Sequence, residues 1–281
     1  MVDLLPNFLH LGPSKSGTTW LYQVLAAHPE VFLCPAKDLH LFNRCYDRGL
    51  DWYRAQFRGA GQRHKVIGEI CPGYLFSGPA PERIRACLGA DVRLMVTLRD
   101  PISRAFSSYL DHRKHGEAAA TFRETTRLLS QLIDEGRYAT HLRNYLEYFG
   151  RESLHVAVFD DLQSDPQAFL DGVTDWLGIA RQQLTPAELE ARLPASEARW
   201  LPLARLAKHG ASWARVHDCA DVVARAKHSA LVQRALYRTL GGERPEMPAE
   251  DIAFMHEQFD AEIADVESEF AISLRQRWNW M

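Results

Sequence analysis

Short apolar runs and amphipathic segments alternate along most of this 281-residue chain. Continuous apolar runs are typical of strands that are buried on both faces of a parallel sheet. They occur at Phe8–Leu11, Lys65–Ile70, Leu94–Leu98, in LHVAVF from Leu154 and, as a shorter segment, at Val31–Leu33. These runs predict the strands of one sheet.

Segments with apolar residues at helical spacing follow the runs. They predict helices that end near Leu25, cover PAPERIRACLG, begin at Pro101, and span Phe122–Leu132, Tyr138–Phe149, Pro166–Leu177 and Met247–Phe270. Helices between parallel strands predict an α/β fold of three layers, in which a central, mainly parallel sheet is flanked by helices. A helical C-terminal region follows the sheet.

Composition narrows the class of protein. A chain of this length that is 46% hydrophobic can bury one large core, which predicts a single domain over residues 1–281. A formal charge of −3 argues against general binding to nucleic acid. No apolar run reaches the ~18 residues that span a bilayer. The five cysteines are an odd number without Cys-x-x-Cys spacing. We therefore expect a soluble, cytoplasmic protein with reduced thiols.

The loop after the first strand, GPSKSGTT, predicts a site for phosphate or sulfate. Its glycines permit a tight turn, and the N–H groups at the start of the next helix attract an anion. Lys15 adds a positive charge, while Ser16, Gly17, Thr18 and Thr19 add hydroxyl and backbone donors. The alternative interpretation is an ordinary turn rich in glycine and serine.

The position of the lysine indicates which anion the loop binds. A nucleotide-triphosphatase loop has its lysine directly after the second glycine, followed by a hydroxyl residue that ligates magnesium. Here Lys15 precedes Gly17, and Thr18 stands where that lysine would be. The charge that a triphosphate needs is missing, although a P-loop nucleotide kinase remains an alternative.

A second anion site is predicted at the end of the strand Leu94–Leu98. Arg99 follows this strand, Asp100 can cap the next helix, and Pro101 suits its first turn. A guanidinium binds phosphate oxygens through paired hydrogen bonds, and the hydroxyl of Ser107, two turns along the helix, can complete the site. The alternative is a capping turn whose arginine forms a structural salt bridge.

Candidate catalytic groups occur in AKDLHLFN and after the strand Lys65–Ile70. Asp38 and His40 are both able to accept a proton from an attacking hydroxyl, and strand alternation would place them on one face. Lys37, Glu69 and Tyr74 are candidates for substrate binding, because the carboxyl ends of parallel strands line the ligand crevice. The alternative is a solvated loop with incidental charges.

The motifs GPSKSGTTWLYQVLAAHPEV, AKDLHLFN, GLDWY, GEICPGY and LRDPISRAFSSY, in this order, resemble the sulfotransferases that use 3′-phosphoadenosine 5′-phosphosulfate (PAPS). The heparan sulfate branch and its bacterial relatives are the most similar. The resemblance implies a P-loop-like fold. It also implies that Lys15 to Thr19 hold the 5′-phosphosulfate, while Arg99 and Ser107 hold the 3′-phosphate.

The resemblance also implies roles for the candidate catalytic residues. Asp38 falls where that branch has its glutamate base, and His40 falls where relatives have histidine or glutamine. Ile70 replaces the lysine of a Glu-Lys-Ser/Thr-Pro-x-Tyr block. The expected reaction is in-line sulfuryl transfer from PAPS, which leaves adenosine 3′,5′-bisphosphate and needs no metal. The acceptor would be a hydroxyl or amine of a carbohydrate, glycolipid or secondary metabolite. A nucleotide-binding module without catalytic activity is the remaining alternative.

Two further features have open interpretations. Residues 184–248 carry a cluster of cations, which predicts a helical lid or acceptor-side region or else a solvated face. These cations are Arg199, Arg205, Lys208, Arg215, Arg225, Lys227, Arg234, Arg238 and Arg244. The adjacent Asp160 and Asp161 are expected to cap a helix and to bond at a strand end rather than to bind a metal. The oligomeric state stays open.

Overall fold

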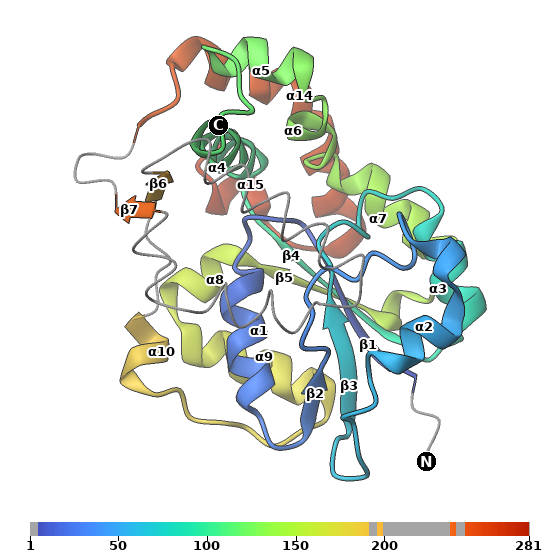
Figure 1. Cartoon of the computed structure of the whole chain (residues 1–281). Coiled ribbons are helices and arrows are strands. Elements are labelled where there is room, and N and C mark those ends of the chain that lie inside the picture. The colour runs from blue at the N-terminus through green and yellow to red at the C-terminus, as the bar shows by residue number, and fades with distance from the viewer. Residues whose placement is uncertain (1–4, 191–195, 199–236, 240–244, 281) are drawn as a thin grey trace.

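The computed structural model describes residues 5–190, 196–198, 237–239 and 245–280 (Figure 1). Its centre is a five-stranded sheet in the order β2-β3-β1-β4-β5, in which all neighbouring strands run parallel. The strands are β1 (Phe8–Gly12), β2 (Val31–Leu33), β3 (Val66–Ile70), β4 (Arg93–Leu98) and β5 (Leu154–Val158). The sheet predicted from the apolar runs is therefore confirmed.

Helices connect the strands and follow the last one. Those before β5 are α1 (Thr18–Ala27), α2 (Gly49–Ala55), α3 (Ala80–Leu88), α4 (Pro101–Lys114), α5 (Phe122–Leu128), α6 (Gln131–Asp134) and α7 (Tyr138–Leu146), with short 3₁₀ turns at Tyr46–Arg48 and Arg151–Ser153. Those after it are α8 (Phe159–Ser164), α9 (Pro166–Leu177), α10 (Pro186–Glu190), α14 (Ala249–Phe270) and α15 (Leu274–Arg277). A small antiparallel pair, β6 (Ser196–Ala198) and β7 (Tyr237–Thr239), belongs to the basic region. Most of residues 184–248 lies outside the described residues.

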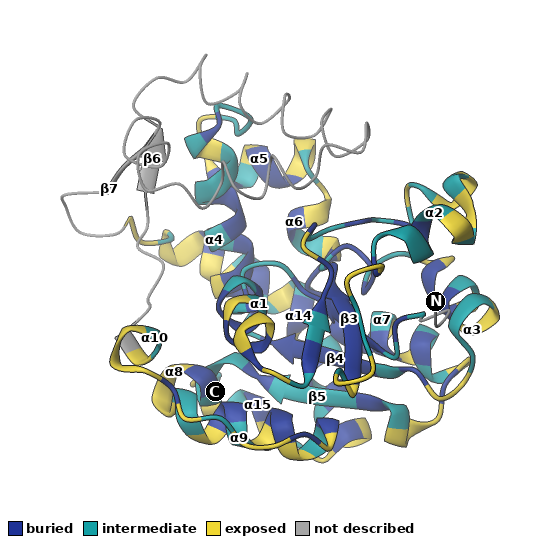
Figure 2. Cartoon of the chain, turned by 60° about the horizontal axis from the view of Figure 1, so that its bottom comes forward, coloured by how far each residue is buried: buried dark blue, intermediate teal, exposed yellow. Residues whose placement is uncertain are grey.

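Two apolar clusters, one on each face of the sheet, form the core. On one face, α1, α8 and α9 pack against side chains such as Phe8 and Met95. On the other face, α4, α7 and α14 pack against side chains such as Leu9 and Val96. Figure 2 shows the buried strands between helices whose outer surfaces are exposed. These are the three layers that the sequence predicts.

The two loops predicted to bind anions follow neighbouring strands. β1 pairs directly with β4, and the register between them shifts between His10 and Gly12, where β1 gives way to its loop. Parallel strands end at the same edge of a sheet, so the loops after β1 and β4 lie side by side. This adjacency agrees with the resemblance, which assigns both loops to one nucleotide.

The start of α4 and the end of α9 follow the predicted capping residues, whereas one predicted helix is divided. The Asp100 carboxylate accepts hydrogen bonds from the N–H groups of Ile102 and Ser103, and Gly178 ends α9 in the left-handed conformation. The continuous helix expected over Phe122–Leu132 is wrong. α5 ends at Leu128 because Leu129 leaves helical geometry, with φ −126° and ψ 76°, and α6 begins at Gln131.

Neither membrane-spanning helices nor disulfides occur in the described ranges. No helix there is both long and apolar enough to cross a bilayer. Cys34, Cys45, Cys71 and Cys87 are free thiols, as expected for reduced cysteines. Cys219 lies outside the described residues.

Candidate active site

The loop between β1 and α1 is compact because two of its positions accept only glycine. Gly12 has φ +119°, and a Cβ there would lie 2.5 Å from the backbone oxygen of Pro72. Gly17 has φ +79° and immediately precedes α1, where a Cβ would meet the Leu162 side chain at 2.5 Å. A side chain at either position would clash with a neighbouring segment. The loop therefore turns tightly and packs closely against its neighbouring segments.

This loop offers several donors to an anion. The first helical hydrogen bond of α1 runs from the Leu21 N–H to the Gly17 carbonyl at 3.0 Å. The N–H groups of the preceding residues, Thr18 among them, thus have no acceptor within the helix. Ser16 is only 1% exposed, and its hydroxyl has no hydrogen-bond partner among the described residues. A buried donor of this kind fits a guest that accepts hydrogen bonds.

The loop after β4 contacts the loop after β1. The Arg99 guanidinium donates from Nη1 to the Lys15 carbonyl oxygen at 2.7 Å, and it lies over the Phe159 ring at 5.0 Å. The Lys15 ammonium lies 3.2 Å from Oδ1 of Asp111 on α4. The two loops that carry the residues predicted to hold the 5′ and 3′ groups therefore contact each other at the edge of the sheet.

Helix α4 contacts the loop after β1 through Asp111. Arg104, Ser107 and Asp111 are spaced so that they project from the same side of the helix. Ser107 is half-buried and lies one turn before Asp111. The sequence motifs indicate Ser107 but not Arg104 or Asp111. Their helical spacing from Ser107 is the feature of the sequence from which both residues could have been predicted.

A buried ion pair between Arg104 and Glu135 helps to hold the loop after β1 in place. Arg104 is fully buried and contacts Oε2 of Glu135 at 2.9 Å and the Leu132 carbonyl at 2.6 Å. The same Glu135 oxygen accepts a hydrogen bond from the Ser14 hydroxyl at 3.2 Å. This chain of contacts fixes Ser14, and with it the loop, to α4 and α6. Sequence analysis missed Glu135, which is distant in sequence from the loop.

Lys37 joins the first loop to the second group of candidates. Its ammonium lies 3.4 Å from the Thr18 carbonyl and 3.4 Å from the Thr19 hydroxyl, and 5.7 Å from the centre of the Tyr22 ring. Burial lowers the pKa of Lys37, and the negative charge of Asp38 opposes this effect. A half-buried ammonium thus lies at the N-terminal end of α1, next to the anion-binding loop.

The segment around Asp38 and His40 is a loop, so the alternation expected of a strand is wrong. Asp38 has φ 62° and His40 has φ 58°, and left-handed residues interrupt the pleat. The Asp38 N–H donates to the Ile70 carbonyl at 3.4 Å, and His40 Nδ1 lies 3.5 Å from Cys71 Sγ. Both residues are thereby held at the carboxyl end of β3, and Asp38 remains half-buried.

Glu69 and Tyr74 lie deeper than a substrate contact requires. Glu69 is 1% exposed and Tyr74 is fully buried. The Glu69 carboxylate and the hydroxyls of Tyr53 and Tyr74 face one another but make no hydrogen bond of good geometry within the described residues. Burial raises the pKa of Glu69 to about 8, and the nearby Asp38 charge acts in the same direction. Substrate binding by Glu69 and Tyr74 stays a prediction.

The buried carboxyl predicts a pH-dependent stability. Glu69 has a pKa of about 8 in the folded state against an ordinary 4.5, so the folded protein holds more protons than the unfolded protein between these values. The free energy of unfolding should therefore fall as pH rises through this window, by on the order of a few kcal/mol in total. Glu69→Gln should flatten that fall in thermal unfolding measured from pH 5 to 9. Glu257→Gln, at an exposed position on α14, is the control. An unchanged slope in Glu69→Gln would contradict this assignment.

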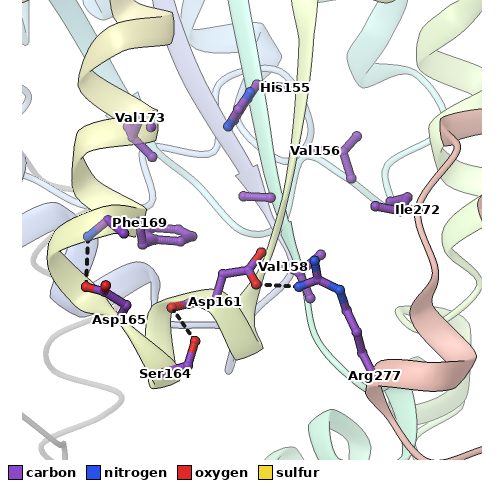
Figure 3. Close-up of a pocket in the computed structure, with 13 residues that line it drawn as sticks. His155, Val156, Val158, Asp161, Ser164, Asp165, Phe169, Val173, Ile272 and Arg277 are labelled. Carbon is purple, nitrogen blue, oxygen red and sulfur yellow. Dashed lines mark hydrogen bonds and ion pairs between the residues drawn. The ribbon is translucent and has the colours of Figure 1, made fainter.

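The adjacent aspartates after β5 contact the C-terminus. Asp160 accepts a hydrogen bond from the Trp278 indole at 3.0 Å, and Asp161 pairs with Arg277. The expected helix cap is wrong, because α8 begins at Phe159 without a side-chain cap. The contact between Asp161 and Arg277 lies at a cavity of about 400 Å³ beside β5. Figure 3 shows both side chains there. None of the predicted site residues lines that cavity.

The parallel sheet, the glycine-bounded loop after its first strand and the cations at its carboxyl edge define an α/β protein with a loop of phosphate-binding type. Comparison with known families gives the more particular result. The sulfotransferase domain family matches residues 5–193, so this chain belongs to that family.

Known relatives agree with this membership. Human heparan sulfate glucosamine 3-O-sulfotransferase 3B1 is 34% identical over an alignment of 186 positions that covers 63% of this chain and 47% of that protein. The human bifunctional heparan sulfate N-deacetylase/N-sulfotransferase 3 is 32% identical over an alignment of 198 positions that covers 63% of this chain and 23% of that protein. This chain therefore matches less than half the length of either relative.

A solved structure confirms the fold. The crystal structure of a sulfotransferase from Alicyclobacillus acidocaldarius superposes with a TM-score of 0.60 at 23% identity. The superposition covers 78% of this chain and 96% of that one. The likeness extends the match from sequence to the architecture of the described residues.

Proposed function

We propose that this protein is an enzyme that transfers a sulfuryl group from PAPS to an acceptor hydroxyl or amine. Membership of the sulfotransferase domain family supports the proposal. The observation that carries it is the 2.7 Å contact between the Arg99 guanidinium and the Lys15 carbonyl. The contact supports the proposal because it joins the two loops that would each hold one phosphate group of the same nucleotide.

The residues present fit this cofactor. Lys15, the Ser16 hydroxyl and the N–H groups of Gly17, Thr18 and Thr19 would hold the 5′-phosphosulfate. The unpartnered, buried Ser16 hydroxyl supports this placement. Arg99 and Ser107 would hold the 3′-phosphate, since a guanidinium presents paired donors to phosphate oxygens. The cofactor supplies a sulfuryl group that is already bonded to a good leaving group, a phosphate.

The chemistry of the chain's own residues is alignment, charge stabilisation and proton transfer. Lys15 stabilises the negative charge that remains on the phosphate oxygen when its bond to sulfur breaks. Asp38 accepts the proton of the acceptor as the acceptor forms its bond to sulfur, and His40 is the second choice for this base. Lys15 and the loop N–H groups provide the charge that magnesium provides in kinases, so this mechanism needs no metal.

We propose a carbohydrate as the acceptor. The relatives described above are named for glucosamine 3-O-sulfation and for N-sulfation of heparan sulfate. The family match over residues 5–193 includes Lys15 and Asp38. Glycolipids and secondary metabolites with hydroxyl groups share the required chemistry. A cytoplasmic location and a single domain stay predictions.

Ligand binding and product analysis test the proposal. Adenosine 3′,5′-bisphosphate should raise the melting temperature more than AMP or ATP does, because only it has both phosphates that the two cation sites require. Labelled PAPS should then transfer its sulfuryl group to members of a panel of oligosaccharides, glycolipids and phenols, and product masses identify the acceptor. A larger shift with ATP and magnesium would support the kinase alternative instead. Binding without transfer to any acceptor would favour a non-catalytic module.

Arg99→Ala should remove the preference for a 3′-phosphate. The loss of charge-assisted hydrogen bonds costs about 1.5 to 3 kcal/mol, which is roughly a 10-fold to 100-fold rise in the Kd of adenosine 3′,5′-bisphosphate. The Kd of AMP, which lacks this phosphate, should rise much less, since the contact of Ser14 with Glu135 still holds the loop after β1. Isothermal titration calorimetry measures both, and Arg85→Ala at an exposed position on α3 is the control. Equal weakening of both ligands would instead assign Arg99 to loop structure alone.

A further inference from the structure

The backbone of Lys15 is fixed, whereas its side chain is able to move. The residue has φ 68°, and its carbonyl oxygen is held by the Arg99 guanidinium at 2.7 Å. Its side chain is 29% exposed and reaches across to α4, where the ammonium lies 3.2 Å from Oδ1 of Asp111. Movement of the four-carbon side chain alone is therefore enough to redirect the charge, without any change in the loop.

Asp111 lies among cations. Burial by itself would raise the pKa of Asp111, but Lys15, with His115 and Lys114, holds this pKa below its ordinary value. The charges of Asp111 and Lys15 both act on Lys114, and burial lowers the pKa of Lys114. The surrounding cations therefore favour the ionised, negatively charged form of Asp111.

The ion pair has little to contribute to the stability of the fold. The Asp111 side chain is 42% exposed, and ion pairs that water reaches add little to the free energy of unfolding. The fixed support of the loop comes instead from the fully buried Arg104 and its contact with Glu135. A role in the site therefore explains the pairing of Asp111 with Lys15 better than a role in the stability of the fold does.

We propose that Asp111 is an internal stand-in for the anionic ligand: its carboxylate holds the Lys15 ammonium until the 5′-phosphosulfate displaces it. This inference rests on the proposed function. Asp111 acts through Lys15 and is a positioning residue, not a catalytic one. It keeps the lysine neutralised in the absence of cofactor, and it lowers apparent affinity because only molecules with a released lysine are ready to bind.

The test is a double-mutant cycle on the Kd of adenosine 3′,5′-bisphosphate, measured by calorimetry. Asp111→Asn should tighten binding about threefold or more, because Lys15 is then available in every molecule. In the Lys15→Ala background the same substitution should have a smaller effect, since no ammonium remains to be released. Asp111→Ser is a second variant that removes the carboxylate, and thermal unfolding verifies that each variant is folded.

Glu117→Gln is the matched control. It removes one negative charge just beyond α4, where Glu117 contacts His112 at 2.9 Å, and should leave the Kd unchanged. The inference is overturned if Asp111→Asn weakens binding, if the control tightens binding equally, or if the effect is the same with and without Lys15. Failure of the wild-type protein to bind this nucleotide would refute the proposed function and this role of Asp111 with it.

Discussion

Lys15→Ala should lower kcat by about 10²-fold or more, as expected when one group that stabilises developing charge is removed from an active site. The loop backbone that holds Lys15 is fixed by Arg99 and by the contact of Ser14 with Glu135. Removing the lysine side chain leaves these contacts in place, so the loss is one of charge rather than of structure. Steady-state rates with labelled PAPS and the acceptor identified by the panel measure the effect.

The control for this substitution is a lysine just before a strand of the same sheet. Lys65→Ala removes a 58% exposed lysine that pairs with Glu30 at the start of β3, at the opposite end of the strands from the loop. Its kcat should match that of the wild-type protein. A wild-type rate in Lys15→Ala would exclude Lys15 from the chemistry, whatever its contacts.

The sheet and the anion-binding loops were predictable because their determinants are local. The run Phe8–Leu11, the glycines that bound the loop and the Arg99-Asp100-Pro101 sequence each specify a strand end and a helix start from neighbouring residues alone. Strand order was accessible only in part. The resemblance to sulfotransferases implied that the loops after β1 and β4 hold one nucleotide, which requires adjacent strands.

The contacts that organise the site were not predictable, because they join residues far apart in the sequence. Lys15 pairs with Asp111, and Ser14 reaches Glu135, across segments whose relative placement depends on how α4 and α6 pack. The positive φ of Asp38 and His40 was also hidden, since an apolar-polar alternation occurs both in strands and in irregular loops. Tertiary contacts to β3, rather than local preference, determine that conformation.

The substitution of isoleucine at position 70 is explained by packing. Ile70 is fully buried in the apolar cluster that includes residues of α1 and α9. An isoleucine side chain suits this apolar environment, and it has no charge to contribute to the site. Lys37 lies beside Thr18 and Thr19, at the start of the same helix. The described residues thus show a cation close to the loop even though the lysine of the related motif is missing.

Asp38→Asn should lower kcat by about 10²-fold to 10⁴-fold, the range for removal of a general base. The asparagine keeps the size of the side chain, and its backbone N–H still donates to the Ile70 carbonyl. Its amide, however, cannot take the proton from the hydroxyl or amine that receives the sulfuryl group. The KM for PAPS should change much less than kcat, because the phosphate-binding loop is intact. Rates at saturating acceptor with labelled PAPS measure this separation.

His40→Asn tests the second candidate for the base. His40 Nδ1 lies 3.5 Å from Sγ of Cys71, so the His40 ring lies at the end of β3. We expect this variant to lose less activity than Asp38→Asn, and Asp38→Glu to retain more than Asp38→Asn because a carboxylate is restored. If His40→Asn proves the more damaging change and Asp38→Asn remains active, the imidazole is the base and Asp38 only orients it.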